Sequence, residues 1–590
     1  MPATRTNRAR AGACATCRTR KRRCIPSDKI SEGCKLCQSI SQPCSLNSNV
    51  PRPIGAMTLS RSATGEDELD TKQKHYDLDS PELLADLVSL YFRYIHNVAH
   101  SLFHEPSFMD RLQDGNASLI HVYAMCALAA RYSNNPSLRD ISPYARGEVY
   151  AKKALSYCHG NMISPTLATV RGLLLIGYYF GGQGNIHGKY VYVGIARLHA
   201  QLVPFENLTD MILREEHRRT WLSIHIASHW SASDMAMEPL SFFDEPSYRP
   251  KIDDAEFHTS GPSLSEGLVS SPPKYGMWAQ MAQTLNIYTK INILIRRLSQ
   301  KSISFPEYCD EADILERDLD QWAEHLPSAL IYNYENLMHM VDKGVGKIFL
   351  SMHIGYYHFR QMLLFPFLDF RLSQSVARNR AVKCKESASI ISDILRASET
   401  TLDCRMMYFI YGHIAVVSSS VQLHTLLFND NQLERNLARD GLISNFQYLM
   451  SLKSYWPVVD HHVAHLRIFQ NSCQNSLENP FVLDSWMARF LTEHTSALSQ
   501  RQLKDSKSSS FDIGTFAADL IDPVNGVVPA ASSSVHEIGA NVSKAVGFEN
   551  TENGDMDYDD LSRIIGDQSL SGEAIVNSAL SWLLDDHIEE

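Results

Sequence analysis

Several common sequence features are missing from this chain of 590 residues, and each absence narrows the possible classes of protein. No run of about eighteen apolar residues occurs, so we expect no membrane-spanning helix. The arginine-rich N-terminus contains no apolar segment, which argues against a secretory leader. Alternating apolar and polar residues are scarce, and this disfavours a β-rich fold. Neither a G-x-S-x-G nor a Walker motif is present, so we do not expect an enzyme.

Histidine is absent from residues 1–50, whereas six of the twelve cysteines of the chain lie there. A pair of thiolates two residues apart can bind one tetrahedral zinc ion, and a third cysteine about two helical turns further on can reach the same ion. The sequence contains this C-x2-C-x6-C pattern twice, with nine residues between the copies. It therefore predicts a metal site built from sulfur alone. The predicted ligands are Cys14, Cys17, Cys24, Cys34, Cys37 and Cys44.

Six thiolates can complete two tetrahedral zinc sites only if two of the sulfurs bridge both ions. Disulfides are an alternative, but they require an oxidising compartment. A redox pair would explain each C-x-x-C but not the third cysteine of each copy. A RING or LIM module would use histidines or two complete sets of four ligands. The sequence thus favours two zinc ions.

The segment between Cys17 and Cys24 is almost entirely basic. A short helix fixed by metal and carrying such side chains suits the phosphates and base edges of the DNA major groove. A solvated basic face, or a nuclear localisation signal alone, is the alternative interpretation. We expect double-stranded DNA as the partner of this segment and the nucleus as its location. The candidate DNA contacts are Arg18, Arg20, Lys21, Arg22 and Arg23.

Residues 13–24 resemble the fungal zinc binuclear cluster transcription factors. The resemblance implies that Cys14 and Cys34 are the bridging sulfurs. It also implies that Lys21, together with Arg20, reads a CGG-type triplet. The family suggests a sequence-specific activator of a metabolic or biosynthetic set of RNA polymerase II genes; a repressor or a zinc-bearing protein-binding adaptor is the alternative. The positions that match phosphate contacts of the family are Arg18 and Arg23.

Charge divides the chain into a basic head, a body and an acidic tail. The first 53 residues hold eleven Lys and Arg against two Asp and Glu, whereas the last 80 hold sixteen acids against two bases. Linkers and tail are expected to be largely disordered. Apolar heptads are absent from residues 45–79, so either dimerisation uses another surface or the protein binds DNA as a monomer. The expected divisions are a DNA-binding domain at 1–53, a linker at 54–80, an α-helical regulatory domain at 81–498, and a flexible linker with the acidic tail at 499–590.

The body is predicted to be all α-helical. Ser80 and Pro81 provide an N-cap and a first helical residue, and helical spacing then continues to about Leu498, with an irregular break near 240–273. The six remaining cysteines are expected to be reduced core thiols. Those cysteines are Cys126, Cys158, Cys309, Cys384, Cys404 and Cys473. The expected helices are 117–133, 144–159, 166–180, 188–203, 213–235, 275–299, 310–325, 344–364, 378–398, 404–427 and 484–498.

The body also resembles the fungal-specific transcription factor domain. The resemblance rests on short stretches in a set order, and it implies a regulatory role; we expect a small-molecule effector or a partner protein to bind there. The sequence 181–184 (GGQG) is interpreted as a turn between helices and not as a phosphate-binding loop. His461, His462 and His465 are interpreted as helix-face residues and not as metal ligands. The matching stretches are 90–92, 103–108, 194–197, 218–221, 319–322 and 326–327.

The acidic tail carries apolar side chains near its end, chiefly Trp582, Leu583 and Leu584. Acidic neighbours keep such a segment solvated, and its apolar side chains stay available to a partner groove. The sequence predicts an activation segment that recruits transcriptional coactivators. The alternative is an acidic tail whose terminal helix docks on the body.

Overall fold

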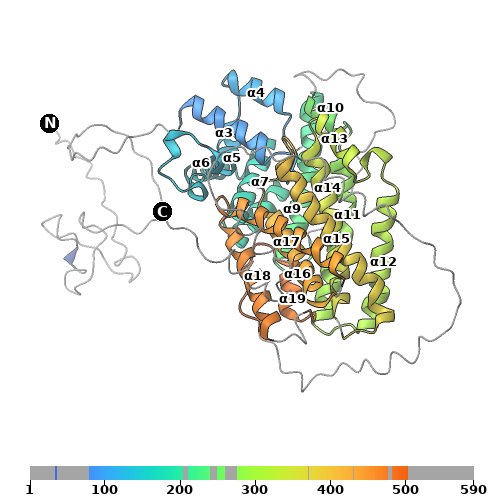
Figure 1. The fold of residues 1–590 in the computed structure, drawn as a ribbon. Helices are drawn as coiled ribbons and strands as arrows, with labels where there is room; N and C mark the ends of the chain where they lie inside the picture. The colour runs from blue at the N-terminus through green and yellow to red at the C-terminus, as the bar shows by residue number, and fades with distance from the viewer. Residues whose placement is uncertain are drawn as a thin grey trace, which may run out of the picture. The chain divides into compact units, whose positions relative to one another are not determined.

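The computed structural model describes residues 34–35, 79–203, 210–239, 249–259, 276–369, 371–429, 431–475 and 481–501. Residues 34–35 belong to one compact unit and the residues from 79 onward to another. The described part of the chain contains helices and no β-strand, so the mostly α-helical fold class is confirmed (Figure 1). In this part no helix combines the length and the apolar character needed to cross a membrane. The predicted linkers and acidic tail lie almost entirely outside it.

The first helices of the body surround α7, which is buried on nearly all sides. α5 packs against α3, α6 and α7; α8 then packs between α7 and α9. Short 3-10 helices follow α5 at Ala130–Tyr132, Pro136–Leu138 and Pro143–Ala145. The helices are α3 (Pro81–Tyr94), α4 (Glu105–Gln113), α5 (Leu119–Ala129), α6 (Glu148–Gly160), α7 (Leu167–Gly182), α8 (Ile186–Ala200), α9 (Met211–Asp234) and α10 (Asp254–Thr259).

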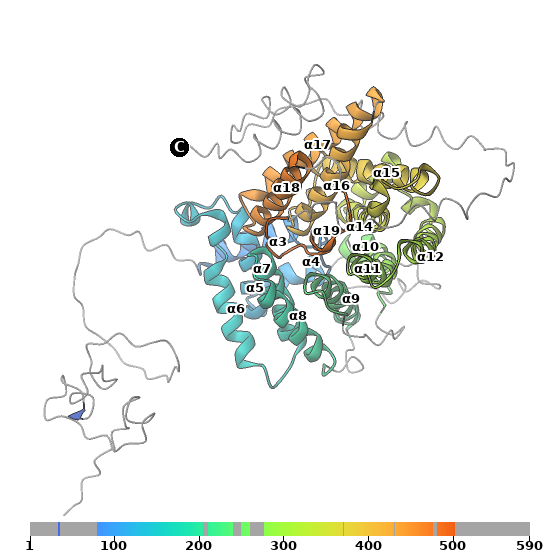
Figure 2. The same ribbon diagram turned by 90° about the horizontal axis from the view of Figure 1, so that it is seen from below.

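The later helices pack around α14 and α16. α11 contacts α9, α12, α14 and α19, and therefore links the two groups (Figure 2). One continuous apolar core extends from Leu83 to Leu498. Short 3-10 helices lie at Ser328–Leu330 and Phe365–Leu368. The helices are α11 (Met277–Ser299), α12 (Phe305–Glu324), α13 (Tyr334–Asp342), α14 (Gly346–Leu364), α15 (Gln374–Thr400), α16 (Ile410–Phe428), α17 (Gln432–Lys453), α18 (Val458–Asn475) and α19 (Ser485–Thr492).

Local sequence signals explain several helix ends. The side chain of Ser80 accepts a hydrogen bond from the backbone N–H of Leu83 at 3.2 Å, which confirms the predicted start of α3. Between α7 and α8, Gly184 has a φ of +74°, a value that favours glycine. The predicted turn between helices is confirmed at residues 183 and 184, whereas Gly181 and Gly182 are the last residues of α7.

Several expected helices are shorter in the structure; the expected helix 117–133, for example, is α5 followed by a 3-10 helix. In two others, tertiary hydrogen bonds compete with the helix. α16 begins at Ile410 and not near 404, since Tyr132 Oη and Trp456 Nε1 both donate to the carbonyl oxygen of Met407. α19 ends at Thr492 and not near 498, since the Asp234 carboxylate accepts the backbone N–H groups of the two residues at 494 and 495. The list of expected helices also omitted α4, α10, α13, α17 and α18.

The six cysteines of the body are unpaired thiols, as predicted. Five are buried, and Cys309 is half-buried. Burial raises the pKa of Cys158 to about 12 and that of Cys309 to about 11. Both thiols therefore stay protonated at neutral pH and pack as small apolar side chains.

Candidate functional site

Most residues predicted to carry the function lie outside the described ranges. Cys34 is the exception among the zinc ligands, and its side chain is fully buried. The roles of all these residues, that of Cys34 included, remain predictions. Those outside the described ranges are Cys14, Cys17, Arg18, Arg20, Lys21, Arg22, Arg23, Cys24, Cys37, Cys44, Trp582, Leu583 and Leu584.

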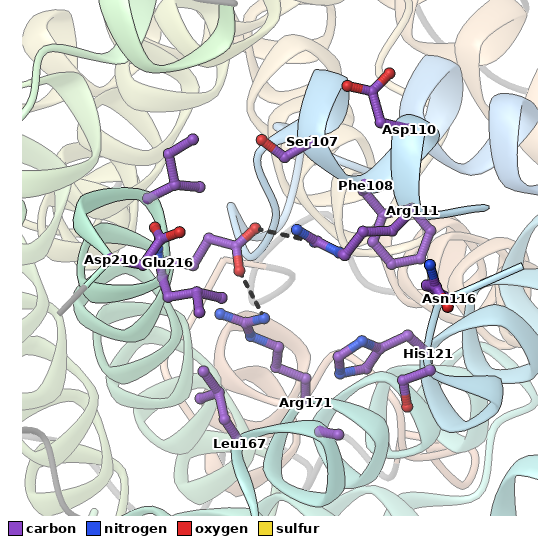
Figure 3. A pocket seen from close by; sticks show the side chains of 14 residues that line it. Ser107, Phe108, Asp110, Arg111, Asn116, His121, Leu167, Arg171, Asp210 and Glu216 are labelled. Atoms are coloured by element: carbon purple, nitrogen blue, oxygen red, sulfur yellow. Dashed lines mark hydrogen bonds and ion pairs between the residues drawn. The ribbon is translucent and has the colours of Figure 1, made fainter. Parts of the chain in front are cut away.

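The body contains a cavity of about 580 Å³ between α4, α5, α7 and α9 (Figure 3). Its volume lies within the range of small-molecule sites, roughly 300–1,000 Å³. Charged side chains and apolar side chains share the wall. The lining residues are Ser107, Phe108, Asp110, Arg111, Asn116, Ser118, His121, Leu167, Ala168, Arg171, Asp210, Ile212, Leu213 and Glu216.

Three helices begin at this cavity. Asp210 caps α9 by accepting a hydrogen bond from the N–H of Leu213 at 3.0 Å, and α7 begins at Leu167. Ser118 is the N-cap residue of α5, but its side chain makes no capping bond there. Helix N-termini carry partial positive charge from their unpaired N–H groups. The backbone around the cavity therefore favours negative charge.

A buried ion pair forms the floor of the cavity. Glu216 of α9 accepts a hydrogen bond from Arg171 Nη1 of α7 at 2.9 Å, and its other oxygen accepts the backbone N–H of His104 at 2.9 Å. Arg111 of α4 lies 3.8 Å from the same carboxylate, and 38% of its side chain is exposed. Figure 3 shows both guanidinium groups beside the open space. Arg171 is held firmly, whereas Arg111 has room to move.

Two nitrogens in the wall have no hydrogen-bond partner among the described residues: Arg171 Nη2 and His121 Nε2. Both side chains are more than nine-tenths buried. Burial lowers the pKa of His121 well below its usual value, and the positive charges of Arg171 and Arg111 lower it further. His121 is therefore neutral at pH 7. A buried polar atom without a partner costs about 1–3 kcal/mol, so each of these atoms calls for an explanation.

A contact between serine and histidine beside the cavity has a structural origin. Ser107 Oγ lies 2.7 Å from His104 Nδ1, and the same nitrogen accepts the backbone N–H of Ser107 at 3.3 Å. His104 is the N-cap residue of α4, and the two residues are three positions apart. The contact is therefore explained by capping of α4.

A second group of buried charges lies on the next residues of α9. Arg219 donates to Asp254 Oδ1 of α10 at 2.6 Å and to Glu215 Oε1 at 3.2 Å. It also donates to the carbonyl oxygen of Ile252 at 3.0 Å. These bonds fasten residues 252–254 to α9, so we assign this group a structural role.

Another buried group joins the end of α9 to the last part of the body. Asp234 Oδ2 accepts a hydrogen bond from Lys189 Nζ at 2.7 Å. Asp234 Oδ1 accepts the backbone N–H groups of His494 and Thr495 at 2.6 and 2.9 Å. Nearby, His461 Nδ1 lies 3.0 Å from the carbonyl oxygen of Thr495, and His462 Nε2 lies 2.7 Å from that of His494. These two helix-face histidines bind backbone, in line with their interpretation from the sequence.

The cavity was not predicted from the sequence. One signal was present: Arg171 interrupts the apolar segment of α7, and a charge in such a position requires a buried partner. The partner Glu216 lies 45 positions away, and no local pattern connects the two residues. Two stretches that carried the family resemblance, 103–108 and 218–221, adjoin the cavity and the buried charges beside it.

The fold and cavity define a class of protein: a large all-α body with a concave polar site. Comparison with known proteins then shows which known domain the body resembles. Residues 88–324 match the fungal specific transcription factor domain. The match begins within α3 and includes the cavity.

Known relatives support the same conclusion. The chain is 24% identical over 385 residues to an uncharacterized transcriptional regulatory protein of Schizosaccharomyces pombe, covering 59% of this chain and 37% of the relative. It is 23% identical over 434 residues to a Zn(2)-C6 fungal-type transcription factor of Fusarium oxysporum, covering 66% of this chain and 46% of the relative. No solved structure shows a significant match. These matches support a fungal transcription factor that carries this domain, and they confirm the resemblance found in the sequence.

The chain spans less than half the length of these two relatives. The matches therefore support a transcriptional regulator, and finer statements about activity and partners are proposals.

Proposed function

We propose that the chain is a zinc-dependent, sequence-specific DNA-binding regulator of transcription that acts in the nucleus and is not an enzyme. The observation that carries the proposal is the repeated C-x2-C-x6-C pattern with five basic residues in its first long gap. The Zn(2)-C6 wording in the names of relatives supports it. The proposed divisions are 1–53 for DNA binding, 54–80 for a linker, 81–498 for regulation, and 499–590 for a linker with the acidic tail.

The donor set suits zinc. Six cysteines without a histidine form a soft, all-sulfur set, which selects zinc over harder cations. The buried side chain of Cys34 fits a ligand that is enclosed by the chain. When bound, two zinc ions supply the folding energy that so short a segment lacks from apolar packing. The six thiolates hold the basic segment in one geometry, with Cys14 and Cys34 as the bridging ligands.

In the basic segment, some residues provide affinity for DNA and others select the DNA sequence. Lys21 and Arg20 donate to base edges of a CGG-type triplet, while Arg18 and Arg23 neutralise phosphates. Arg22 is a further DNA contact. The proposed outcome is activation of a metabolic or biosynthetic set of RNA polymerase II genes. The second candidate is a repressor, or an adaptor that binds proteins in place of DNA. It is kept because the acidic tail is the feature of the sequence that favours activation.

The test uses the full chain. Metal analysis should find two zinc ions per chain, and a gel-shift assay should find tighter binding to CGG-containing DNA than to scrambled DNA. Lys21→Ala should reduce this preference, with a loss of about 1–3 kcal/mol per base contact, whereas Arg18→Ala should weaken binding to both DNAs alike. Lys29→Ala is the matched control, because Lys29 lies outside the six-residue basic segment. One zinc ion per chain, or equal loss on both DNAs for both variants, would refute this mechanism.

The acidic tail is proposed to recruit coactivators through Trp582, Leu583 and Leu584. In a reporter assay with the full chain, Trp582→Ala combined with Leu583→Ala should remove most of the output without changing the melting temperature of the body. Val576→Ala with Ile575→Ala is a control in the same tail. If the first pair destabilises the body and leaves the reporter active, the segment is a docked structural helix.

A further inference from the structure

The wall of the cavity between α4, α5, α7 and α9 contains polar atoms that a ligand could bind. Arg171 Nη2 and His121 Nε2 are deeply buried and lack hydrogen-bond partners among the described residues. Both side chains line the same cavity of about 580 Å³ and point into it (Figure 3). We propose that this cavity binds a small organic carboxylate with an apolar body, which regulates the protein as an effector. The inference deepens the proposed regulatory function by naming the class of effector.

Two guanidinium groups of the wall, those of Arg111 and Arg171, can bind an anion, and three carboxylates also line the cavity. Arg171 has a donor to spare, and Arg111 lies 3.8 Å from Glu216, beyond normal hydrogen-bond distance. A carboxylate between the two guanidinium groups would receive charge-assisted hydrogen bonds, which are about twice as strong as neutral ones. The first turns of α5, α7 and α9 add partial positive charge.

Three acidic residues line the wall, but each is either hydrogen-bonded within the protein or directed away from the cavity, which lessens its repulsion of an anion. Glu216 is already engaged by Arg171 and by the N–H of His104. Asp210 is engaged as the cap of α9. The carboxylate of Asp110 points away from the cavity in Figure 3. The groups that remain to face a ligand are thus mainly donors.

The apolar side chains of the wall indicate that the ligand has an apolar part beside its carboxylate. Phe108, Leu167 and Leu213 provide apolar surface beside the charged end. The Arg111 guanidinium lies 5.8 Å from the centre of the Phe108 ring, so charged and apolar surfaces are adjacent. An ion such as chloride would leave the apolar surface uncovered. A carboxylate with a short aliphatic or aromatic body would cover both.

The experiment measures ligand binding to the full chain in the absence of DNA. The probes are octanoate, phenylacetate and 3-phenylpropionate, each paired with its primary amide, which has the same shape and no charge. At least one acid should bind in calorimetry and raise the melting temperature of the body, whereas its amide should bind about tenfold or more weakly.

Two substitutions should act in opposite directions. Arg111→Gln should weaken binding of the acid about tenfold and reduce its preference over the amide, since only Arg171 then remains to pair with the carboxylate. Glu216→Gln should strengthen binding, because it removes a negative charge that competes for Arg171. Arg139→Gln is the matched control, since Arg139 is exposed and lies outside the cavity wall. Its affinity should equal that of the unmodified protein.

The inference is overturned if none of the acids binds, if each amide binds as tightly as its acid, or if Arg111→Gln leaves the affinity unchanged. A gel-shift assay on the same preparations reports DNA binding separately. A chain that binds CGG-containing DNA but no acid would retain the proposed function and refute the effector site. A chain that binds an acid but no DNA would support the effector site and refute the proposed DNA binding.

Discussion

Two of the buried carboxylates of helix α9, one near its start and one at its end, have different surroundings. Asp234, at its last residue, accepts hydrogen bonds from Lys189 and from the backbone of His494 and Thr495. Glu216, near its start, accepts hydrogen bonds from Arg171 and from the backbone of His104. Both carboxylates are fully buried and paired with a buried cation.

The two carboxylates are alike, and the difference between the two sites lies in the residues that surround them. Around Asp234 the donors bring α8, α9 and the segment after α19 together, and the group forms a clamp. Around Glu216, Arg171 keeps one unpartnered nitrogen and borders an open cavity. The same pair of charges therefore stabilises the fold at one end of α9 and leaves capacity for a ligand at the other. The following substitutions test this contrast.

The largest effect is expected from Asp234→Asn. The substitution keeps the shape but leaves Lys189 buried without its charge partner, and breaking a buried pair costs about 3–5 kcal/mol. Urea unfolding of the full chain should show this loss in the transition of the body. Asp140→Asn, at an exposed position, is the control and should change stability by less than about 0.5 kcal/mol. Equal stabilities of the two variants would contradict the clamp.

A smaller loss is expected from Glu216→Gln. The substitution removes the charge partner of Arg171, but Arg171 borders a cavity into which its guanidinium can shift, so we expect about 1–3 kcal/mol. The same urea unfolding assay measures it. A loss as large as that of Asp234→Asn would indicate that the two ends of α9 do not differ in function.

The pH dependence of stability probes a group of buried histidines that includes His358, His413 and His494. Burial lowers the pKa of His358 in α14 to about 3, below its value of about 6.5 in the unfolded chain. The unfolded state therefore takes up the proton first. The contribution of His358 is fully present above pH 6.5 and is lost as the pH falls from 6.5 toward 3, at up to about 1.4 kcal/mol per pH unit.

His358→Gln should remove the contribution of His358 to the slope of the unfolding free energy against pH between pH 6.5 and 5. This holds whatever the effect of the substitution on stability at pH 7. Urea unfolding at several pH values measures the slope. His413, whose ring lies 5.7 Å from His358, and His494 also have lowered pKa values, so part of the pH dependence should remain. An unchanged slope would mean that His358 is not held neutral by burial.

The smallest effect on stability is expected from Arg111→Gln. Its side chain is partly exposed and lies 3.8 Å from Glu216, and such pairs contribute less than about 1 kcal/mol. Urea unfolding should therefore hardly distinguish this variant from the unmodified protein, although its affinity for the acid probes should fall. Destabilisation beyond that of Glu216→Gln would make Arg111 a structural residue.

Much of the helical framework could be predicted because its signals are local. The cap at Ser80, the apolar spacing of α7 and the glycine turn at 184 are set by neighbouring residues. α17 was omitted from the expected helices. It contains a glycine and many polar residues, several of which are buried only because other helices cover them. Burial of that kind leaves no clear periodic signal in the sequence.

The sequence by itself determined the helical class of the body, the start of α3 and the turn between α7 and α8, because backbone propensity and capping act over a few residues. It also provides the cysteine repeat from which the zinc and DNA predictions follow. Only the tertiary structure decided where α16 begins and α19 ends, because side chains far away in the chain bind the backbone there. It alone brought Arg171, Glu216 and His121 to one cavity, since these residues come from three helices and their contacts depend on how those helices pack.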